Sequence, residues 1–216
     1  MIISHKHKFI FIKTRKTAGT SVELLLGRFC GEDDVVTQIY DPDIDKFNHQ
    51  PRNDQGFYNH IGAGQIRNMV GDDIWDNYFK FSIERNPWDK MVSMFWWRKF
   101  QYKLPESFHD FCHKALGLID DNVYTVPNDY SLYTLDSKLA VNELFYYESL
   151  DSSLKSVFNK LGLGGDFLMP RAKSQHRKVK KHYSEYYDDK LRARVQMRFK
   201  DTIDLLSYSF QQKVHV

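Results

Sequence analysis

The chain has 216 residues and a formal net charge of +3. Hydrophobic residues make up 42% of the sequence and charged residues 27%, a composition that is ordinary for a globular protein and excludes a disordered chain. The length suits one domain over residues 1–216 with a sizeable core. No apolar run approaches the length needed to cross a bilayer.

The N-terminal segment and the cysteines predict the cellular location. The first candidate strand begins too near Met1 for a signal peptide, so we expect a cytoplasmic protein. The two cysteines, Cys30 and Cys112, are then expected to be reduced core residues rather than a disulfide pair.

The positive charge is concentrated in one segment, residues 171–182 (RAKSQHRKVKKH), which holds six Lys or Arg and no acidic residue. Removing these six leaves 25 basic and 28 acidic residues in the rest of the chain. Because the basic character is local, a compact anion is a better partner than a long polyanion such as a nucleic acid. A solvated helix face is the alternative.

Apolar periodicity predicts alternating strands and helices in the first part of the chain. The buried run KFIFIK predicts a strand, and the helical spacing of apolar residues after Thr20 predicts a helix. A second strand, a polar loop rich in turn residues and a short helix follow. The ranges are 8–13 for the first strand, 20–29 for its helix, 35–40 for the second strand, 41–60 for the loop and 63–70 for the short helix.

The second part continues the alternation. YFKFSIERNP predicts a strand that ends before Pro87, a residue that suits the first turn of a helix. A helix with a buried apolar face follows, then a third core strand, its helix, and one long or two shorter helices. The strand segment before the helix is 78–87, the third core strand is 143–148, its helix is 150–162, and the last helical segment is 183–206. The sequence therefore predicts an α/β fold with three layers, in which helices flank a central, mostly parallel sheet.

The loop KTRKTAGTS joins the first strand to its helix. In a parallel sheet, ligands bind where the strands end, and the start of a helix offers free N–H groups and a partial positive charge to an anion. Gly19 permits close approach of the backbone, and Lys16 supplies a point charge. Hydroxyl donors are Thr17, Thr20 and Ser21. The alternative is a helix capped by Thr20 or Ser21 with solvated lysines.

A second strand-to-helix junction carries ERNPWDKMVS, residues 84–93. Arg85 ends the strand and Ser93 lies eight positions later in the helix, so a guanidinium and a hydroxyl can converge on a phosphate. Taken alone, Arg85 would more often form an ion pair. The combination of two such junctions, in order along the chain and each with anion-binding groups, predicts a site for a phosphate-containing ligand.

Both junctions resemble the nucleotide motifs of the sulfotransferase family, in its carbohydrate-modifying branch. The first resembles the 5′-phosphosulfate loop P-K-T-x-x-T-S/T, in which Lys16, Thr17, Thr20 and Ser21 match and Arg15 replaces the proline. The second resembles the 3′-phosphate signature, in which Arg85 and Ser93 match. Weaker similarity covers residues 59–71, 146–150 and 173–187, so the resemblance touches most of the chain.

The resemblance implies a P-loop-like fold and the donor 3′-phosphoadenosine 5′-phosphosulfate (PAPS), with the product PAP and no metal ion. It implies in-line attack of an acceptor hydroxyl on sulfur, with Lys16 stabilising the leaving oxygen. The acceptor implied is a carbohydrate or glycoconjugate. The residues expected to bind the donor are Arg15, Lys16, Thr17, Ala18, Gly19, Thr20, Ser21, Arg85, Ser93, Arg177 and Lys178.

The acceptor hydroxyl needs a general base, and histidine suits this role because its pKa lies near operating pH. His60 is the first candidate, because it follows a loop and precedes a short helix, as the base does in several family members. A surface or capping role is the alternative for such a residue. His49 is the reserve candidate, and Glu84 is a third.

Two features have alternative interpretations. The basic run is expected either to close on the 3′-phosphate through residues such as Arg177 and Lys178, or to attract an anionic acceptor. Four aromatic residues in and just after the helix that follows Pro87 can stack on a sugar, although core packing is expected for at least two of them. These residues are Phe95, Trp96, Trp97 and Tyr102.

Two other functions compete with sulfuryl transfer. A P-loop kinase requires a G-x-x-x-x-G-K-[ST] loop and an Asp that holds Mg²⁺ at a strand end, whereas here the lysine precedes the glycine and the third core strand offers only Glu148. The other candidate is a non-catalytic module that binds anionic glycans. Such a module needs no nucleotide site, whereas Lys16, Arg85 and Ser93 indicate that one is present.

Overall fold

A computed structural model of the chain describes residues 1–41, 44–103, 107–117, 126–164, 168–170, 179 and 181–211. These residues belong to two compact units. The first contains Met1–Glu84 and Ser131–Ala172, and the second contains Arg85–Tyr130 and Lys173–Val216. One domain over the whole chain stays a prediction.

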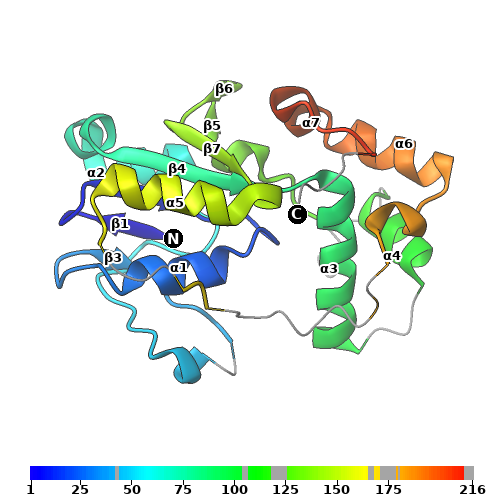
Figure 1. Cartoon of the computed structure of the whole chain (residues 1–216). Helices are drawn as coiled ribbons and strands as arrows, with labels where there is room; N and C mark the ends of the chain where they lie inside the picture. The colour runs from blue at the N-terminus through cyan, green and yellow to red at the C-terminus, as the bar shows by residue number, and fades with distance from the viewer. Residues whose placement is uncertain are drawn as a thin grey trace. The chain divides into compact units, whose positions relative to one another are not determined.

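The first unit is built on a five-stranded sheet (Figure 1). Its strands, in spatial order, are β3 (Val35–Val36), β1 (Ile2–Ser4), β2 (Phe9–Ile12), β4 (Phe79–Glu84) and β7 (Glu143–Tyr146). β2, β4 and β7 are parallel, whereas β1 is antiparallel to both of its neighbours. β3 therefore runs in the same direction as β2, and only β1 is reversed among these five. The predicted α/β fold with a mostly parallel sheet is confirmed.

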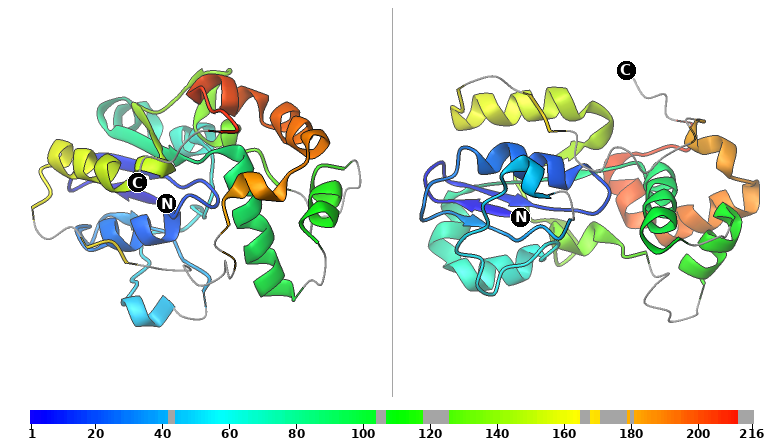
Figure 2. Two further views of the ribbon diagram at one scale, coloured as in Figure 1. Left: turned by 45° about the vertical axis from the view of Figure 1, so that its right-hand side comes forward. Right: turned by 90° about the horizontal axis from the view of Figure 1, so that it is seen from below.

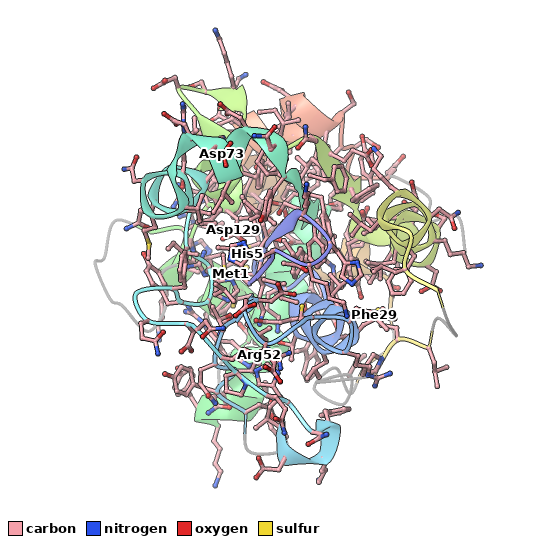
Figure 3. All side chains as sticks on the ribbon, turned by 90° about the vertical axis from the view of Figure 1, so that its left-hand side faces the viewer. Met1, His5, Phe29, Arg52, Asp73 and Asp129 are labelled. Carbon is pink, nitrogen blue, oxygen red and sulfur yellow. The ribbon has the colours of Figure 1, made fainter. Side chains whose placement is uncertain are left out.

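Alternation along the strands places large apolar side chains on one face of the sheet. Phe81 of β4 stacks on Phe11 of β2 with ring centroids 5.2 Å apart and meets Phe145 of β7 edge-on at 6.1 Å. Two helices cover this face, α1 (Gly19–Gly27) and α5 (Leu150–Leu161), as Figure 2 shows. Their ends also pack together, because the ring of Phe29, labelled in Figure 3, meets Phe158 edge-on at 5.3 Å.

The opposite face is covered by α2 (Ala63–Asn77), which completes three layers (Figure 2). Lys80 of β4 points to this side, where its ammonium donates to the carbonyl oxygen of Trp75 at 2.5 Å. Gly71 interrupts α2 with a non-helical backbone (φ 79°), so the predicted short helix over 63–70 corresponds to its first part.

Short elements connect these layers. They are the 3₁₀ turns η1 (Ile44–Phe47), η2 (Asp129–Leu132) and η3 (Tyr147–Ser149), and the hairpin of β5 (Thr134–Leu135) and β6 (Lys138–Leu139). The predicted strand over 35–40 is shorter in the structure, since only the first two residues pair.

The second unit is helical. Its elements are α3 (Pro87–Tyr102), α4 (Phe108–Ala115), the 3₁₀ turn η4 (Tyr183–Tyr186), α6 (Asp189–Arg198) and α7 (Lys200–Leu206). Asn86 caps α3 by accepting from the Trp88 N–H, with Pro87 in the first turn as the sequence predicts. The predicted helical segment over 183–206 is divided into η4, α6 and α7.

Aromatic residues form much of the packing in this unit. The ring of Phe95 lies 5.6 Å from that of Phe108 and 5.7 Å from that of Phe111. Trp96 is half-buried and donates through Nε1 to the Tyr186 hydroxyl at 3.1 Å. Phe95 and Trp96 thus pack within the protein, while Tyr102 is 52% exposed.

Both cysteines have free thiols, as predicted. Cys112 is buried and Cys30 is partly buried, and burial raises the pKa of Cys30 to about 12. Within the described ranges, no helix is both long enough and apolar enough to span a bilayer.

Candidate active site

The predicted anion-binding loop lies at the carboxyl end of β2. From β2 the chain passes through α1 to β3, which is the edge strand on one side of β2. It then passes through α2 to β4, which is the neighbour of β2 on the other side. The end of β2 is therefore a topological switch point, the place where open α/β sheets bind their ligands. The sequence motif and the sheet topology indicate the same location.

The start of α1 has an unusual backbone and no side-chain cap. Lys16 and Ala18 both have left-handed backbones, with φ of 62° and 59°. Ala18 occupies the N-cap position and supplies no side-chain hydrogen bond, so neither Thr20 nor Ser21 caps the helix. Because a helix start carries N–H groups without intrahelical partners and a partial positive charge, this turn suits an anion.

Thr14 and Thr17 hold the loop in place. The Thr14 hydroxyl donates to the carbonyl oxygen of Ile83 in β4 and lies 2.9 Å from the hydroxyl oxygen of Thr17. Thr17 is fully buried, and its hydroxyl also contacts the Thr14 carbonyl oxygen at 3.3 Å. In this structure the Thr17 hydroxyl bonds within the loop. Of the three predicted hydroxyl donors, Thr20 is the most exposed, because Thr17 and Ser21 are buried.

Gly19 is required by close packing. A Cβ atom at this position would lie 2.7 Å from Cγ of Lys13 and 3.3 Å from the carbonyl oxygen of Thr14. The stem of Lys13 thus runs directly beneath the first residue of α1, which leaves no room for a side chain there.

Lys13 is buried, with 4% of its surface exposed, and forms an ion pair with Glu23 of α1 at 2.5 Å. Glu23 also accepts from the Met1 amino group at 2.7 Å and from the Thr37 hydroxyl at 2.6 Å. Burial by itself raises the pKa of Glu23, but the Met1 amino group and the Lys13 ammonium beside it outweigh burial and lower the pKa. The carboxylate is therefore ionised at neutral pH.

His60 lies against the same loop. Its Nδ1 is 2.9 Å from the carbonyl oxygen of Lys13, and its backbone is left-handed with φ of 66°. Because a carbonyl oxygen only accepts, Nδ1 carries the hydrogen and Nε2 of the neutral ring is the acceptor. The structure thus brings the predicted base to the residue that begins the predicted anion loop.

The other base candidates have different surroundings. His49 donates through Nε2 to the carbonyl oxygen of Thr37 at 3.0 Å, and desolvation lowers its pKa. It lines a pocket of about 220 Å³ at the carboxyl end of α1, the end opposite the loop. Glu84 is buried and accepts from the Tyr133 hydroxyl at 3.2 Å.

Arg85 and Ser93 lie in the second unit. The Arg85 guanidinium bonds to one carboxylate oxygen of Asp89 through Nε at 3.0 Å and Nη2 at 2.6 Å. Asp89 and Ser93 are one helical turn apart on one face of α3, whereas Arg85 precedes the helix. The ion pair that the sequence left as an alternative for Arg85 is present.

Two predicted donor-binding residues, Arg177 and Lys178, lie outside the described residues, as do residues 171–176 and Lys180 of the basic run. Conversely, Lys13, Asn59 and Asp89 were not among the predicted site residues. The signal for both Lys13 and Asn59 was their position in the sequence, since Lys13 begins the predicted loop and Asn59 immediately precedes His60.

Known proteins resemble the chain in sequence and in structure. A family model described as the sulfotransferase family matches residues 1–209. An uncharacterized protein of Archaeoglobus fulgidus is 33% identical over 104 residues, which are 47% of this chain and 82% of that protein. The crystal structure of mouse sulfotransferase SULT7A1 complexed with PAP has the same fold, with a TM-score of 0.56 and 16% identity over 95% of this chain and 90% of the mouse chain. This chain is therefore an enzyme of the sulfotransferase family.

Proposed function

We propose that this sulfotransferase uses PAPS as its donor and transfers the sulfuryl group to a hydroxyl group of a carbohydrate or glycoconjugate. The observation that carries the donor is the start of α1 at the switch point, which has no side-chain cap and has Lys16 in the preceding turn. One anionic phosphosulfate fits such a turn, whereas a nucleoside triphosphate requires a longer loop that wraps its phosphates.

The loop residues have separate roles in this proposal. The N–H groups at the start of α1, with Thr20 and Ser21, hold the 5′-phosphate. Lys16 stabilises the negative charge that develops on the bridging oxygen as the sulfur–oxygen bond breaks. Arg85 and Ser93 bind the 3′-phosphate, and Arg177 and Lys178 assist them. No metal ion takes part.

His60 supplies the base. Its Nε2 accepts the proton of the acceptor hydroxyl while that oxygen forms a bond to sulfur, and the bond from sulfur to the 5′-phosphate oxygen breaks, so that PAP leaves. Catalysis then depends on alignment of the reacting atoms and on stabilisation of the leaving oxygen.

A carbohydrate acceptor is supported by the resemblance of the two nucleotide motifs to the carbohydrate-modifying branch of the family. A cytoplasmic location is proposed from the sequence alone. The resemblance to the carbohydrate-modifying branch makes a soluble glycan or a sugar-containing metabolite a more suitable acceptor than a phenol.

The donor is tested by binding. We expect PAP to raise the melting temperature more than AMP does, because only PAP carries a 3′-phosphate. Equal shifts with PAP and AMP would remove the roles of Arg85 and Ser93. A rise with ATP and Mg²⁺ but none with PAP would favour a kinase instead.

The acceptor is tested by product analysis. The enzyme is incubated with ³⁵S-labelled PAPS and separate panels of glycans, lipids and phenols, and labelled products are identified by mass spectrometry. Label on a glycan hydroxyl is the expected result. Label only on a phenol or lipid contradicts the acceptor class, and binding of an anionic glycan without any transfer supports a non-catalytic module.

A further inference from the structure

A group of buried polar side chains lies beneath the anion loop in the first unit, and the proposed transfer does not use it. It consists of Lys13, Glu23, Thr37 and Asn59. Lys13 donates to Glu23 at 2.5 Å and to Oδ1 of Asn59 at 2.9 Å, and Thr37 donates to Glu23 at 2.6 Å. Glu23 and Thr37 have no exposed surface. A buried network of this kind is stable only when its charges and hydrogen bonds are satisfied together.

Asn59 connects this network to His60. Its Oδ1 accepts from the Lys13 ammonium, while its Nδ2 donates to the carbonyl oxygen of Gln38 at 2.5 Å. Because one partner only donates and the other only accepts, the amide has one satisfactory orientation. The residue immediately before His60 is thereby fixed from both ends of its side chain.

Lys13 also holds His60 directly, through its main chain. Its carbonyl oxygen accepts from Nδ1 of His60 at 2.9 Å. The left-handed backbone of His60 (φ 66°) is uncommon for a residue other than glycine, and such a conformation persists where the surrounding contacts enforce it. The ammonium and the carbonyl of one lysine therefore fix two consecutive residues, Asn59 and His60.

We propose that Lys13 and Asn59 are positioning residues for His60, which hold its ring with Nε2 as the proton acceptor. This inference rests on the proposed function, in which His60 is the base. Glu23 completes the device, because its carboxylate compensates the Lys13 ammonium. When Nε2 takes the acceptor proton, the imidazolium keeps its Nδ1–H bond to the Lys13 carbonyl oxygen.

The first test is kinetic. Asn59→Ala is expected to lower kcat by up to about 100-fold, the loss that a small misplacement of a catalytic group can cause, and to leave the Kd of PAP unchanged. The matched control is Asn53→Ala. Asn53 is also left-handed (φ 49°) and its side chain donates to the carbonyl oxygens of Glu32 and Asp34. An Asn59→Ala variant that loses no more kcat than Asn53→Ala overturns the proposal.

A double-mutant cycle separates positioning from general destabilisation. If Asn59 acts through His60, Asn59→Ala has no further effect on kcat in a His60→Ala background. Independent, multiplying losses in the double variant contradict this. If the wild-type enzyme transfers no sulfuryl group, the proposed function itself is wrong. This outcome differs from failure of the positioning proposal, in which the wild type is active but the losses multiply.

A spectroscopic test does not depend on catalytic activity. In wild-type enzyme labelled with ¹⁵N-histidine, we expect the His60 ring to be the Nδ1–H tautomer at a pH where it is neutral. Comparison with His60→Ala assigns its signals. The Nε2–H tautomer in the wild type would overturn the proposal, and a mixture of tautomers in Asn59→Ala is the supporting result.

Discussion

Lys16 combines a charge with an unfavourable backbone. Its φ of 62° places it in the left-handed region, which costs a residue with a side chain about 1–2 kcal/mol relative to the right-handed one. Such strain is often found at functional sites, where the surrounding structure maintains it. Here Thr14 and Thr17 maintain it, because they bond to one another and Thr14 is tied to β4.

Lys16→Ala is expected to reduce kcat by about 10²–10³-fold, the usual loss when one preorganised group that stabilises a leaving oxygen is removed. The rate is measured with labelled PAPS and the acceptor found in the panel, and circular dichroism checks the fold. Lys155→Ala, at an exposed position of α5, is the control. Turnover within threefold of the wild type in Lys16→Ala would assign the leaving-group role to another residue.

Arg85→Lys is expected to weaken PAP binding about tenfold while AMP binding stays the same, since lysine cannot reproduce the planar fork of a guanidinium. Isothermal titration calorimetry measures both nucleotides. Arg67→Lys is a suitable control, because Arg67 also pairs with an aspartate, Asp72, but at an exposed position. Equal losses for PAP and AMP would contradict a role specific to the 3′-phosphate.

At the scale of elements, the junction of β2 and α1 depends on two small residues for different reasons. Ala18 has the left-handed φ of 59° that favours glycine, whereas Gly19 lies against the stem of Lys13. The sequence places its glycine where space is limiting, and the left-handed backbone falls on the preceding alanine.

Gly19→Ala is therefore expected to lower the free energy of unfolding by about 1–3 kcal/mol, as overpacking in a well-packed region does. Urea denaturation measures the change. Gly164→Ala is the control, because a Cβ at Gly164 meets no atom within 4 Å. If both variants were equally stable, Lys13 would have to move at no cost.

Ala18→Gly should change stability in the opposite direction. Relief of the left-handed backbone is expected to raise the free energy of unfolding by about 0.5–1 kcal/mol, after the greater flexibility of glycine in the unfolded chain is included. The same urea experiment measures it. A loss of stability would mean that the alanine methyl group contributes packing that exceeds the strain.

At the scale of the whole molecule, the buried Lys13–Glu23 pair couples stability to pH. The pKa of Glu23 in the folded protein is lower than the reference value of 4.5. Its ionised form therefore stabilises the native state above the pKa of the unfolded chain, and this stabilisation is lost as the pH falls through the folded-state pKa.

Glu23→Gln is expected to lower the free energy of unfolding by about 3–5 kcal/mol at neutral pH, because Lys13 loses its buried counter-charge. Its stability should also decrease less steeply than that of the wild type between about pH 5 and pH 3. Urea denaturation across this range measures both effects. Glu143→Gln, which removes a more exposed pair with Lys160, is expected to change stability by less than about 1 kcal/mol. Parallel pH profiles for Glu23→Gln and the wild type would contradict the linkage.

Local sequence determined most elements of the fold and the two nucleotide motifs. Strands β2, β4 and β7 and helices α1, α3 and α5 follow from periodicity and from Pro87, because burial of one face imposes a regular spacing. Strand β1 and helix α4 were not predicted. β1 has only three residues, and its strand conformation depends on pairing with both β2 and β3.

Only the tertiary structure brought His60 and Asn59 to Lys13, from which they are separated by 47 and 46 residues. Spacing identifies residues that share one helix or one loop, so it found Lys16 and Arg85. It does not identify neighbours that meet because the chain crosses from one side of β2 to the other. The sequence by itself identified the loop at the end of β2 as a candidate anion site, whereas sheet topology decided which histidine lies beside that loop.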